Sequence, residues 1–136
     1  MTNRSVILTQ SQMYLMQRHI NFIAPIEACG LVGGRNDIVE LVLPVKNAAE
    51  SKTRFIMDPK AQLRAIQQIE SEGLELLAIF HSHPKGPSTP SETDIAESRY
   101  AAANIIWAKT GRRWTARAFI IENGISVEIP LTILNV

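Results

Sequence analysis

Hydrophobic positions along the first part of the chain change their period several times, and each change predicts a new element. Residues 5–9 hold the apolar run of a short strand. The next apolar residues recur at helical spacing and predict a helix: Met13, Met16, Ile20 and Ile23. The apolar run 28–34 ends in glycines, and the β-branched segment 38–45 follows an Asn36-Asp37 turn. This pair of segments predicts a β-hairpin.

A second helix is predicted to begin after Asp58. Asp58 is a favourable N-cap, Pro59 suits the first helical position, and Gly73 ends the helix. Three residues are expected on its buried face: Leu63, Ile66 and Ile69. Residues 54–57 predict a short strand before this helix. The almost uninterrupted apolar run 74–80 is too short for another helix and predicts a strand buried on both faces.

The last part of the chain predicts a loop, a helix and closing strands. Residues 84–90 contain three prolines and a glycine, which favour a loop, and Ser91 is expected to open a helix that runs to about Ala101. Strands separated by turns at Gly111 and Asn123-Gly124 are predicted over 105–107, 116–121 and 125–134. The expected fold class is α/β, with a mixed, α+β-like sheet and flanking helices.

Composition limits the classes of protein that fit. The 136 residues predict a single domain over residues 1–136. Hydrophobic residues make up 46% and charged residues 20%, which excludes disorder, and a net charge of +1 gives no sign of nucleic-acid or membrane binding. No apolar run approaches the roughly 18 residues of a membrane span, and the N-terminus lacks a signal-peptide pattern. We therefore expect a cytoplasmic protein.

The lone cysteine, Cys29, cannot form an intrachain disulfide, so any metal must be held mainly by His, Asp or Glu. His81 and His83 follow the predicted strand 74–80, and residues two apart on a strand project to the same side. Asp94 follows the proline-rich loop and could supply a third ligand. Two histidines and one carboxylate leave a fourth position of a tetrahedral zinc site to water, whose pKa zinc lowers to roughly 7.

A hydrolase also needs a group that moves protons. Glu27 is the candidate, because it lies in the otherwise apolar stretch 26–31, where desolvation would raise its pKa toward the working range. Ser91 could donate a hydrogen bond to the oxyanion of a tetrahedral intermediate. The Ser-x-x-Asp pattern of residues 91–94 is also that of a helix-capping box, and the two roles are compatible.

Taken together, these residues resemble the JAMM motif of the JAB/MPN metallopeptidases. The run His81-Ser82-His83, seven residues, Ser91, two residues and Asp94 matches that motif, as do the proline after the second histidine and the Glu-x-Cys-Gly context of Glu27. The resemblance implies a single-domain JAB/MPN-like fold with cytidine-deaminase-like architecture. It also implies zinc on His81, His83 and Asp94, with Glu27 as general acid/base and Ser91 as oxyanion stabiliser.

The same resemblance implies a substrate class. Members cleave amide or isopeptide bonds at the C-terminal tail of ubiquitin-like proteins, including prokaryotic sulfur-carrier proteins. The extended tail would be held by strand addition beside the zinc. The chain has no room for the substrate-binding insertions of eukaryotic deubiquitinases, so it resembles the short prokaryotic type.

Other interpretations stay open from the sequence. A non-catalytic MPN-type scaffold would use the site structurally, and a thiol hydrolase would pair Cys29 with His81. A zinc nucleobase deaminase is disfavoured because its His-x-Glu and Cys-x-x-Cys elements are absent. Of the other residues, His19 is expected on an exposed helix face. Trp107 and Trp114 are expected to pack in the core.

Overall fold

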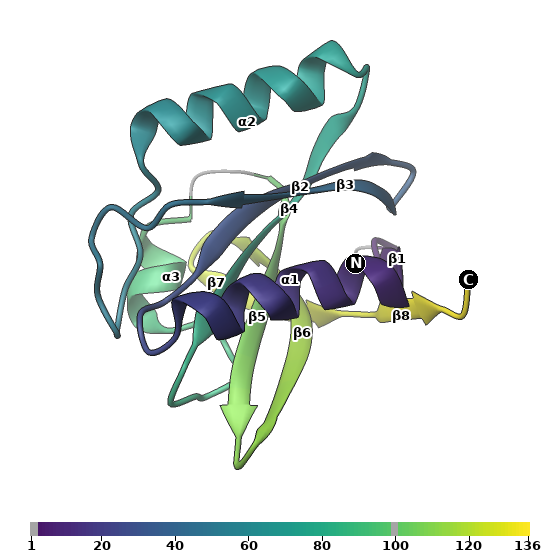
Figure 1. Ribbon diagram of the computed structural model, residues 1–136. Helices are drawn as coiled ribbons and strands as arrows, with labels where there is room; N and C mark the ends of the chain where they lie inside the picture. The colour runs from purple at the N-terminus through teal and green to yellow at the C-terminus, as the bar shows by residue number, and fades with distance from the viewer. Residues whose placement is uncertain (1–2, 99–100) are drawn as a thin grey trace.

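The computed structural model describes residues 3–98 and 101–136 of the chain, and these ranges contain three helices and eight strands (Figure 1). The helices are α1 (Gln10–Ile23), α2 (Pro59–Ser71) and α3 (Glu92–Ala96). The strands are β1 (Val6–Thr9), β2 (Cys29–Arg35), β3 (Ile38–Val45), β4 (Glu75–His83), β5 (Ala103–Thr110), β6 (Arg113–Glu122), β7 (Ile125–Ile129) and β8 (Leu131–Leu134). The strands form one mixed sheet in the order β7-β6-β5-β4-β2-β3-β1-β8.

The sheet has a helix on each face. In Figure 1, α2 lies above the sheet and α1 below it. Met16 and Ile20 of α1 belong to one buried cluster, whereas Ala65 and Ile69 of α2 belong to the other. Strand β4 lies between β2, to which it is antiparallel, and β5, to which it is parallel. Phe80 packs with the α1 cluster and Ile79 with the α2 cluster, so β4 is covered on both faces as the sequence predicts.

Local sequence signals explain where the first elements begin and turn. Thr9 and Gln12 form a capping box at the start of α1. Asn36 and Asp37, in the turn between β2 and β3, both have positive φ angles, of 54° and 65°. Asparagine and aspartate tolerate this conformation better than most residues, which suits a tight hairpin. The predicted first helix and β-hairpin are therefore confirmed.

Two sequence predictions around the helices are wrong. Residues 54–57 form no strand, because only Met57 makes an isolated bridge, to Asn47. The helix that follows Ser91 ends at Ala96, whereas the sequence predicts a helix to about residue 101. Residues 99 and 100 of that predicted helix lie outside the described residues. No residue of α3 is buried, so no packed apolar face stabilises a longer helix.

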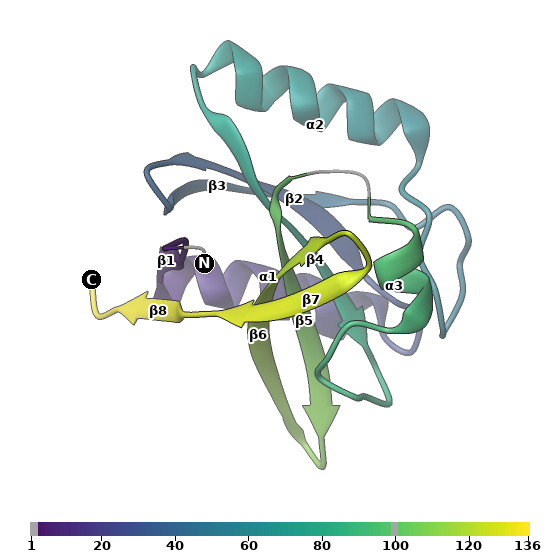
Figure 2. The ribbon, with the colours of Figure 1, turned by 180° about the vertical axis from the view of Figure 1, so that it is seen from behind.

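Packing also corrects two smaller expectations. Leu63 of α2 is 56% exposed, because the buried face of this helix runs through Ala65 and Ile69 instead. The segment 125–134 is two strands rather than one, since Pro130 lacks the N–H that would continue the ladder. Strand β7 pairs with β6, whereas β8 pairs with β1 at the other end of the strand order. The two run consecutively in Figure 2, so the sheet is nearly closed.

The aromatic and imidazole side chains outside the motif have mixed outcomes. Trp107 and Trp114 are buried, at 1% and 9% exposure, which confirms their packing role. His19 is half-buried rather than exposed, and its ring meets Phe80 edge-on at 6.4 Å between centroids. Among the described residues, no helix is long and apolar enough to cross a membrane.

Candidate active site

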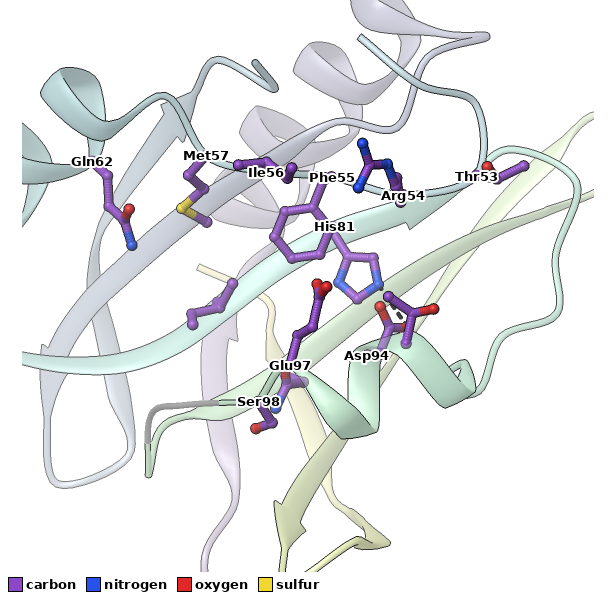
Figure 3. A pocket seen from close by; sticks show the side chains of 13 residues that line it. Thr53, Arg54, Phe55, Ile56, Met57, Gln62, His81, Asp94, Glu97 and Ser98 are labelled. Carbon is purple, nitrogen blue, oxygen red and sulfur yellow. Dashed lines mark hydrogen bonds and ion pairs between the residues drawn. The ribbon is translucent and has the colours of Figure 1, made fainter. Parts of the chain in front are cut away.

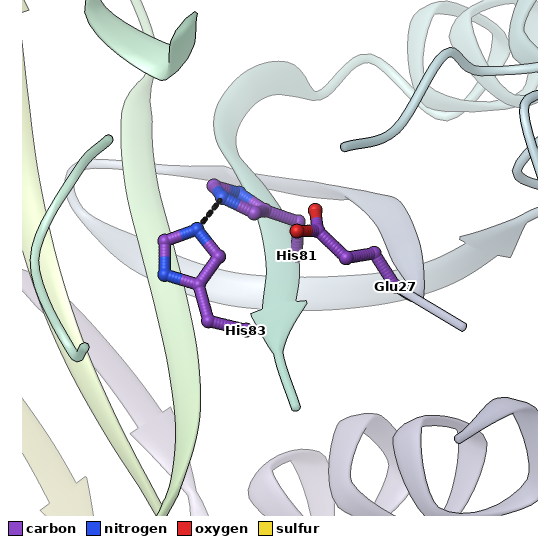
Figure 4. A group of neighbouring side chains, drawn as sticks. All are labelled: Glu27, His81 and His83. Atoms are coloured by element: carbon purple, nitrogen blue, oxygen red, sulfur yellow. Dashed lines mark hydrogen bonds between the residues drawn. The ribbon is translucent and has the colours of Figure 1, made fainter. Parts of the chain in front are cut away.

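Strand β4 carries both histidines of the motif at its C-terminal end. His81 and His83 project to the same side, and their Nε2 atoms are 3.1 Å apart (Figure 4). Both side chains are buried, and Phe55 and Asp94 lie against the rings. The period of two residues along a strand, which predicts this pairing from the sequence, is therefore observed.

Asp94 reaches the two imidazoles from the first turn of α3. One of its carboxylate oxygens, Oδ2, is 3.1 Å from the Nε2 atoms of both His81 and His83. The same oxygen accepts a hydrogen bond of 2.8 Å from the backbone N–H of Ser91, while the Ser91 hydroxyl accepts one from the Asp94 N–H. The capping box is thus present, and it aims the Asp94 carboxylate at the histidines.

The three ligand atoms form a triangle that fits a small metal ion. Each of its edges measures 3.1 Å. Tetrahedral zinc with bonds of about 2.0–2.1 Å sets its ligand atoms about 3.3 Å apart. A further observation points to the same place, since the Glu27 Oε1 atom beside the imidazoles is buried without a hydrogen-bond partner among the described residues. The donor set therefore fits a metal cofactor.

Two neighbours fix how the histidine rings lie. The Nδ1 atom of His83 is 2.7 Å from the carbonyl oxygen of Pro87, so Nδ1–H donates to this loop carbonyl and Nε2 is left to face Asp94. The ring of Phe55 stacks on His81 at 4.6 Å between centroids and an angle of 30°. The proline-rich loop and the 51–57 loop therefore support the rings from outside the strand.

Glu27 lies beside the imidazole pair, two residues before the start of β2. Its side chain is 3% exposed, and a carboxylate oxygen lies within 4.8 Å of ligand atoms of His81 and His83 (Figure 4). This trio could itself hold a metal, but Asp94 is nearer to both rings and is hydrogen-bonded to them. Asp94 thus completes the triangle with the two imidazoles, and the Glu27 carboxylate lies beside it.

The electrostatics separate the two carboxylates further. Burial raises the pKa of Glu27 to about 7, with His83 opposing the shift and Asp94 adding to it. Burial also acts to raise the pKa of Asp94, but hydrogen bonds from His81 and His83 outweigh it and hold that pKa far below its usual range. Near neutral pH, Asp94 is thus a fixed anion, whereas Glu27 can take up and release a proton.

The pKa values of the two imidazoles also shift in opposite directions. Burial lowers the pKa of His81 despite its hydrogen bond to Asp94. The pKa of His83 is raised, because its hydrogen bonds to Asp94 and Pro87 outweigh the effect of burial. The hydrogen bond to Asp94 acts to raise the pKa of both histidines, so the protonation of the three groups is linked.

A cavity of about 370 Å³ opens beside His81 and Asp94 (Figure 3). One wall is the 53–57 segment, and α3 with Glu97 and Ser98 forms another. In Figure 3 the ring of Phe55 and the Glu97 carboxylate both point into this space. A substrate segment placed here would lie directly against the candidate metal ligands.

Three residues at the site carry no role in the sequence predictions. Phe55 stacks on His81, Ser82 accepts a 2.9 Å hydrogen bond from the Ala28 N–H, and the Asn47 side chain binds the Glu27 carbonyl. A signal existed for Ser82, because a residue between two same-side histidines must face the other way. The contacts of Phe55 and Asn47 join distant segments and have no local signal.

Comparison with known proteins identifies the family to which the chain is similar. The family model described as prokaryotic homologs of the JAB domain matches residues 9–119. A probable TtuB-protein conjugate cleaving protease of Thermus thermophilus is 40% identical over 129 residues, 94% of this chain and 79% of that protein. A desampylase of Pyrococcus furiosus is 32% identical over 97 residues, 71% of this chain and 68% of that protein. The solution structure of a Desulfitobacterium hafniense protein is 32% identical with a TM-score of 0.86, covering 96% and 94% of the two chains.

The chain belongs to the prokaryotic JAB-domain family. It is an enzyme of the metallopeptidase class, in agreement with relatives that are named as proteases. The resemblance and the α/β fold expected from the sequence are thereby confirmed. The thiol-hydrolase interpretation finds no support, because Cys29 is fully buried and its pKa is raised to about 12, first by desolvation and then by Glu27.

Proposed function

We propose that the protein is a zinc-dependent isopeptidase that hydrolyses the amide bond at the C-terminal tail of a ubiquitin-like or sulfur-carrier protein conjugate. One observation carries the proposal. Two imidazole nitrogens and one carboxylate oxygen lie 3.1 Å apart, with a second buried carboxylate next to them and a cavity in front. The relative named for cleaving TtuB-protein conjugates supports the substrate class.

In this proposal His81, His83 and Asp94 hold the zinc. When bound, zinc supplies Lewis acidity, which makes water a nucleophile near neutral pH and polarises the carbonyl that is attacked. Asp94 stays ionised and keeps its orientation through the hydrogen bond from the Ser91 N–H. The His83 ring is kept in the required tautomer by the Pro87 carbonyl.

Glu27 and Ser91 carry the proton and charge steps. Glu27 takes a proton from the attacking water and delivers it to the leaving amine, for which its pKa of about 7 is suited. The Ser91 hydroxyl accepts a hydrogen bond from the Asp94 N–H, and its own hydrogen remains to be donated. Ser91 would donate this hydrogen to the oxyanion that forms on the carbonyl.

The cavity beside His81 would hold the tail of the substrate. In this proposal a flexible C-terminal tail would lie between the 53–57 segment and α3, which line the cavity, with its last carbonyl at His81 and Asp94. The 53–57 segment belongs to no strand apart from the isolated bridge at Met57, although the Arg54 carbonyl and the Ile56 N–H are bonded to Asn47. In this proposal the tail adds along this segment as a strand.

The test is cleavage of purified conjugates by zinc-loaded protein, with Glu27→Gln as the decisive variant. This substitution keeps the shape of the side chain and removes its ability to take a proton. We expect about one zinc per chain in both proteins, and a rate about 10²–10⁴-fold lower in the variant. A variant that binds zinc and cleaves at the wild-type rate would refute the role of Glu27. Zinc binding without cleavage of any such conjugate would favour the scaffold interpretation.

A further inference from the structure

Glu27 lies outside the hydrogen-bond ladder of the sheet. Strand β2 begins two residues later, at Cys29, so neither neighbouring strand binds the backbone of Glu27. Its N–H donates instead to the Ser51 carbonyl, at 2.9 Å, and its carbonyl accepts from the Asn47 side-chain amide, at 2.9 Å. Both backbone groups of the proton-transfer residue are therefore held by the loop between β3 and α2.

The Asn47 side chain is the hub of this loop. It is 7% exposed, and its amide nitrogen donates to the carbonyls of Glu27 and Arg54, at 2.9 and 3.1 Å. Its oxygen accepts from the N–H groups of Ala49 and Ile56, each at 3.0 Å. A primary amide has two donor hydrogens and an oxygen with two lone pairs, so all four bonding positions are used. No other common side chain of this size offers both functions.

The loop that Asn47 organises also touches the rest of the site. Phe55, between two residues that Asn47 binds, stacks on the ring of His81. Residues 53–57 form a wall of the cavity in front of the candidate metal ligands. One side chain thus fixes the backbone of Glu27 and the wall against which a substrate would lie. Figure 3 shows this wall and Figure 4 shows Glu27.

We infer that Asn47 is a positioning residue, which sets the Glu27 carboxylate relative to the substrate-facing 53–57 segment. This inference rests on the proposed function, in which Glu27 moves the proton. A displacement of a reacting group by about 1 Å can lower a rate by about 10²-fold. Loss of the Asn47 hydrogen bonds should therefore lower the rate of the chemical step. Asn47 itself does not touch the reacting atoms.

Two substitutions and one control test this role. Asn47→Asp keeps the oxygen that accepts from Ala49 and Ile56 but removes the donor to the Glu27 carbonyl. Asn47→Ala removes all four bonds. The control is Asp58→Ala, which removes the N-cap of α2 at the far end of the same loop without a bond to Glu27. All are studied as folded, zinc-loaded protein.

The first readout does not depend on activity. Amide hydrogen exchange at the Glu27 N–H, which is bonded to Ser51, should be at least about 10-fold faster in both Asn47 variants, and unchanged in Asp58→Ala. Unchanged exchange at Glu27 in both Asn47 variants would overturn the inference. Because this measurement needs no substrate, it decides the coupling even if no conjugate is cleaved and the proposed function fails.

The second readout separates positioning from general stability. On a conjugate that the wild-type protein cleaves, kcat should fall about 10- to 100-fold in the Asn47 variants, with KM within about 3-fold and zinc content unchanged. Asp58→Ala should keep the wild-type kcat. In a Glu27→Gln background, Asn47→Ala should lower the remaining rate by less than about 2-fold, because the two residues act as one unit. An equal loss in both backgrounds would show that Asn47 does not act through Glu27.

Discussion

The two faces of strand β4 divide stability and chemistry between them. On one face, Ala78 and Phe80 pack into the cluster that contains Met16 and Ile20 of α1. On the other face, Ile79 and His81 line the cavity, and His83 meets Asp94. Neighbouring residues only one position apart thus serve different purposes, because successive side chains of a strand point to opposite sides.

The difference lies in what supports each face. The apolar face is covered by α1, and its residues are held by close packing. The other face is covered by α2 where Ile79 packs with Ala65 and Ile69. Around His81 and His83 it is covered by loops and by the short helix α3, which hold the two rings through hydrogen bonds and a ring stack. Changes on the first face should therefore cost stability, and changes on the second should cost metal binding and activity.

The largest effect is expected on the polar face, from the double substitution His81→Ala and His83→Ala. Two of three candidate ligands are lost, so bound zinc should fall from about one per chain to near zero. Cleavage should drop by at least about 10³-fold. Metal analysis and a cleavage assay measure both, with circular dichroism as a check of folding. Full zinc content in the variant would place the metal elsewhere.

On the apolar face, Phe80→Ala should lower the free energy of unfolding by about 3–5 kcal/mol, because a fully buried ring is replaced by a cavity. Urea unfolding followed by circular dichroism measures this loss. Phe80→Leu is the matched control and should lose less, since it fills part of the space. Zinc content of the folded fraction should stay unchanged. Loss of zinc in folded Phe80→Ala would mean that the two faces are not independent.

A smaller effect is expected from His19, whose ring lies against Phe80 on the same apolar face. Burial lowers its pKa below the ordinary value of 6.5, so the folded state binds fewer protons than the unfolded state. Stability should thus decrease as the pH falls through about 6.5. His19→Gln removes this titration, and its unfolding free energy should depend less steeply on pH between about 7 and 5. Equal slopes would contradict the prediction.

The smallest effect is expected from Cys29, which pairs with His81 across β2 and β4. Its pKa is raised to about 12, so the thiol stays protonated at neutral pH. Native protein at pH 8 should resist iodoacetamide and react only after denaturation. Cys29→Ala should retain the wild-type cleavage rate within about 2-fold. Loss of activity together with rapid labelling of native Cys29 would revive the thiol mechanism.

Sequence prediction succeeded where the deciding contacts are local. The Asp58-Pro59 start of α2, the Asn36-Asp37 turn and the same-side arrangement of His81 and His83 depend only on residues close together in the chain. It failed for the 54–57 segment, which has strand-forming residues but no strand beside it with which to pair beyond one bridge. The extent of α3 was overestimated for a similar reason, since helix signals at Ser91 set a start but no packing extends the helix.

The sequence alone determined which residues could do the chemistry. The spacing of His81, His83, Ser91 and Asp94, with Glu27 upstream, predicted the family and the candidate ligands, because strand period and helix capping act over a few residues. Only the tertiary structure decided how Glu27 is held beside the ligands. Glu27 and Asn47 are 20 residues apart, and the hydrogen bond between them exists only after β2, β3 and the loop have come together. Contacts of this kind leave no periodic trace in the chain, since they depend on where whole elements pack.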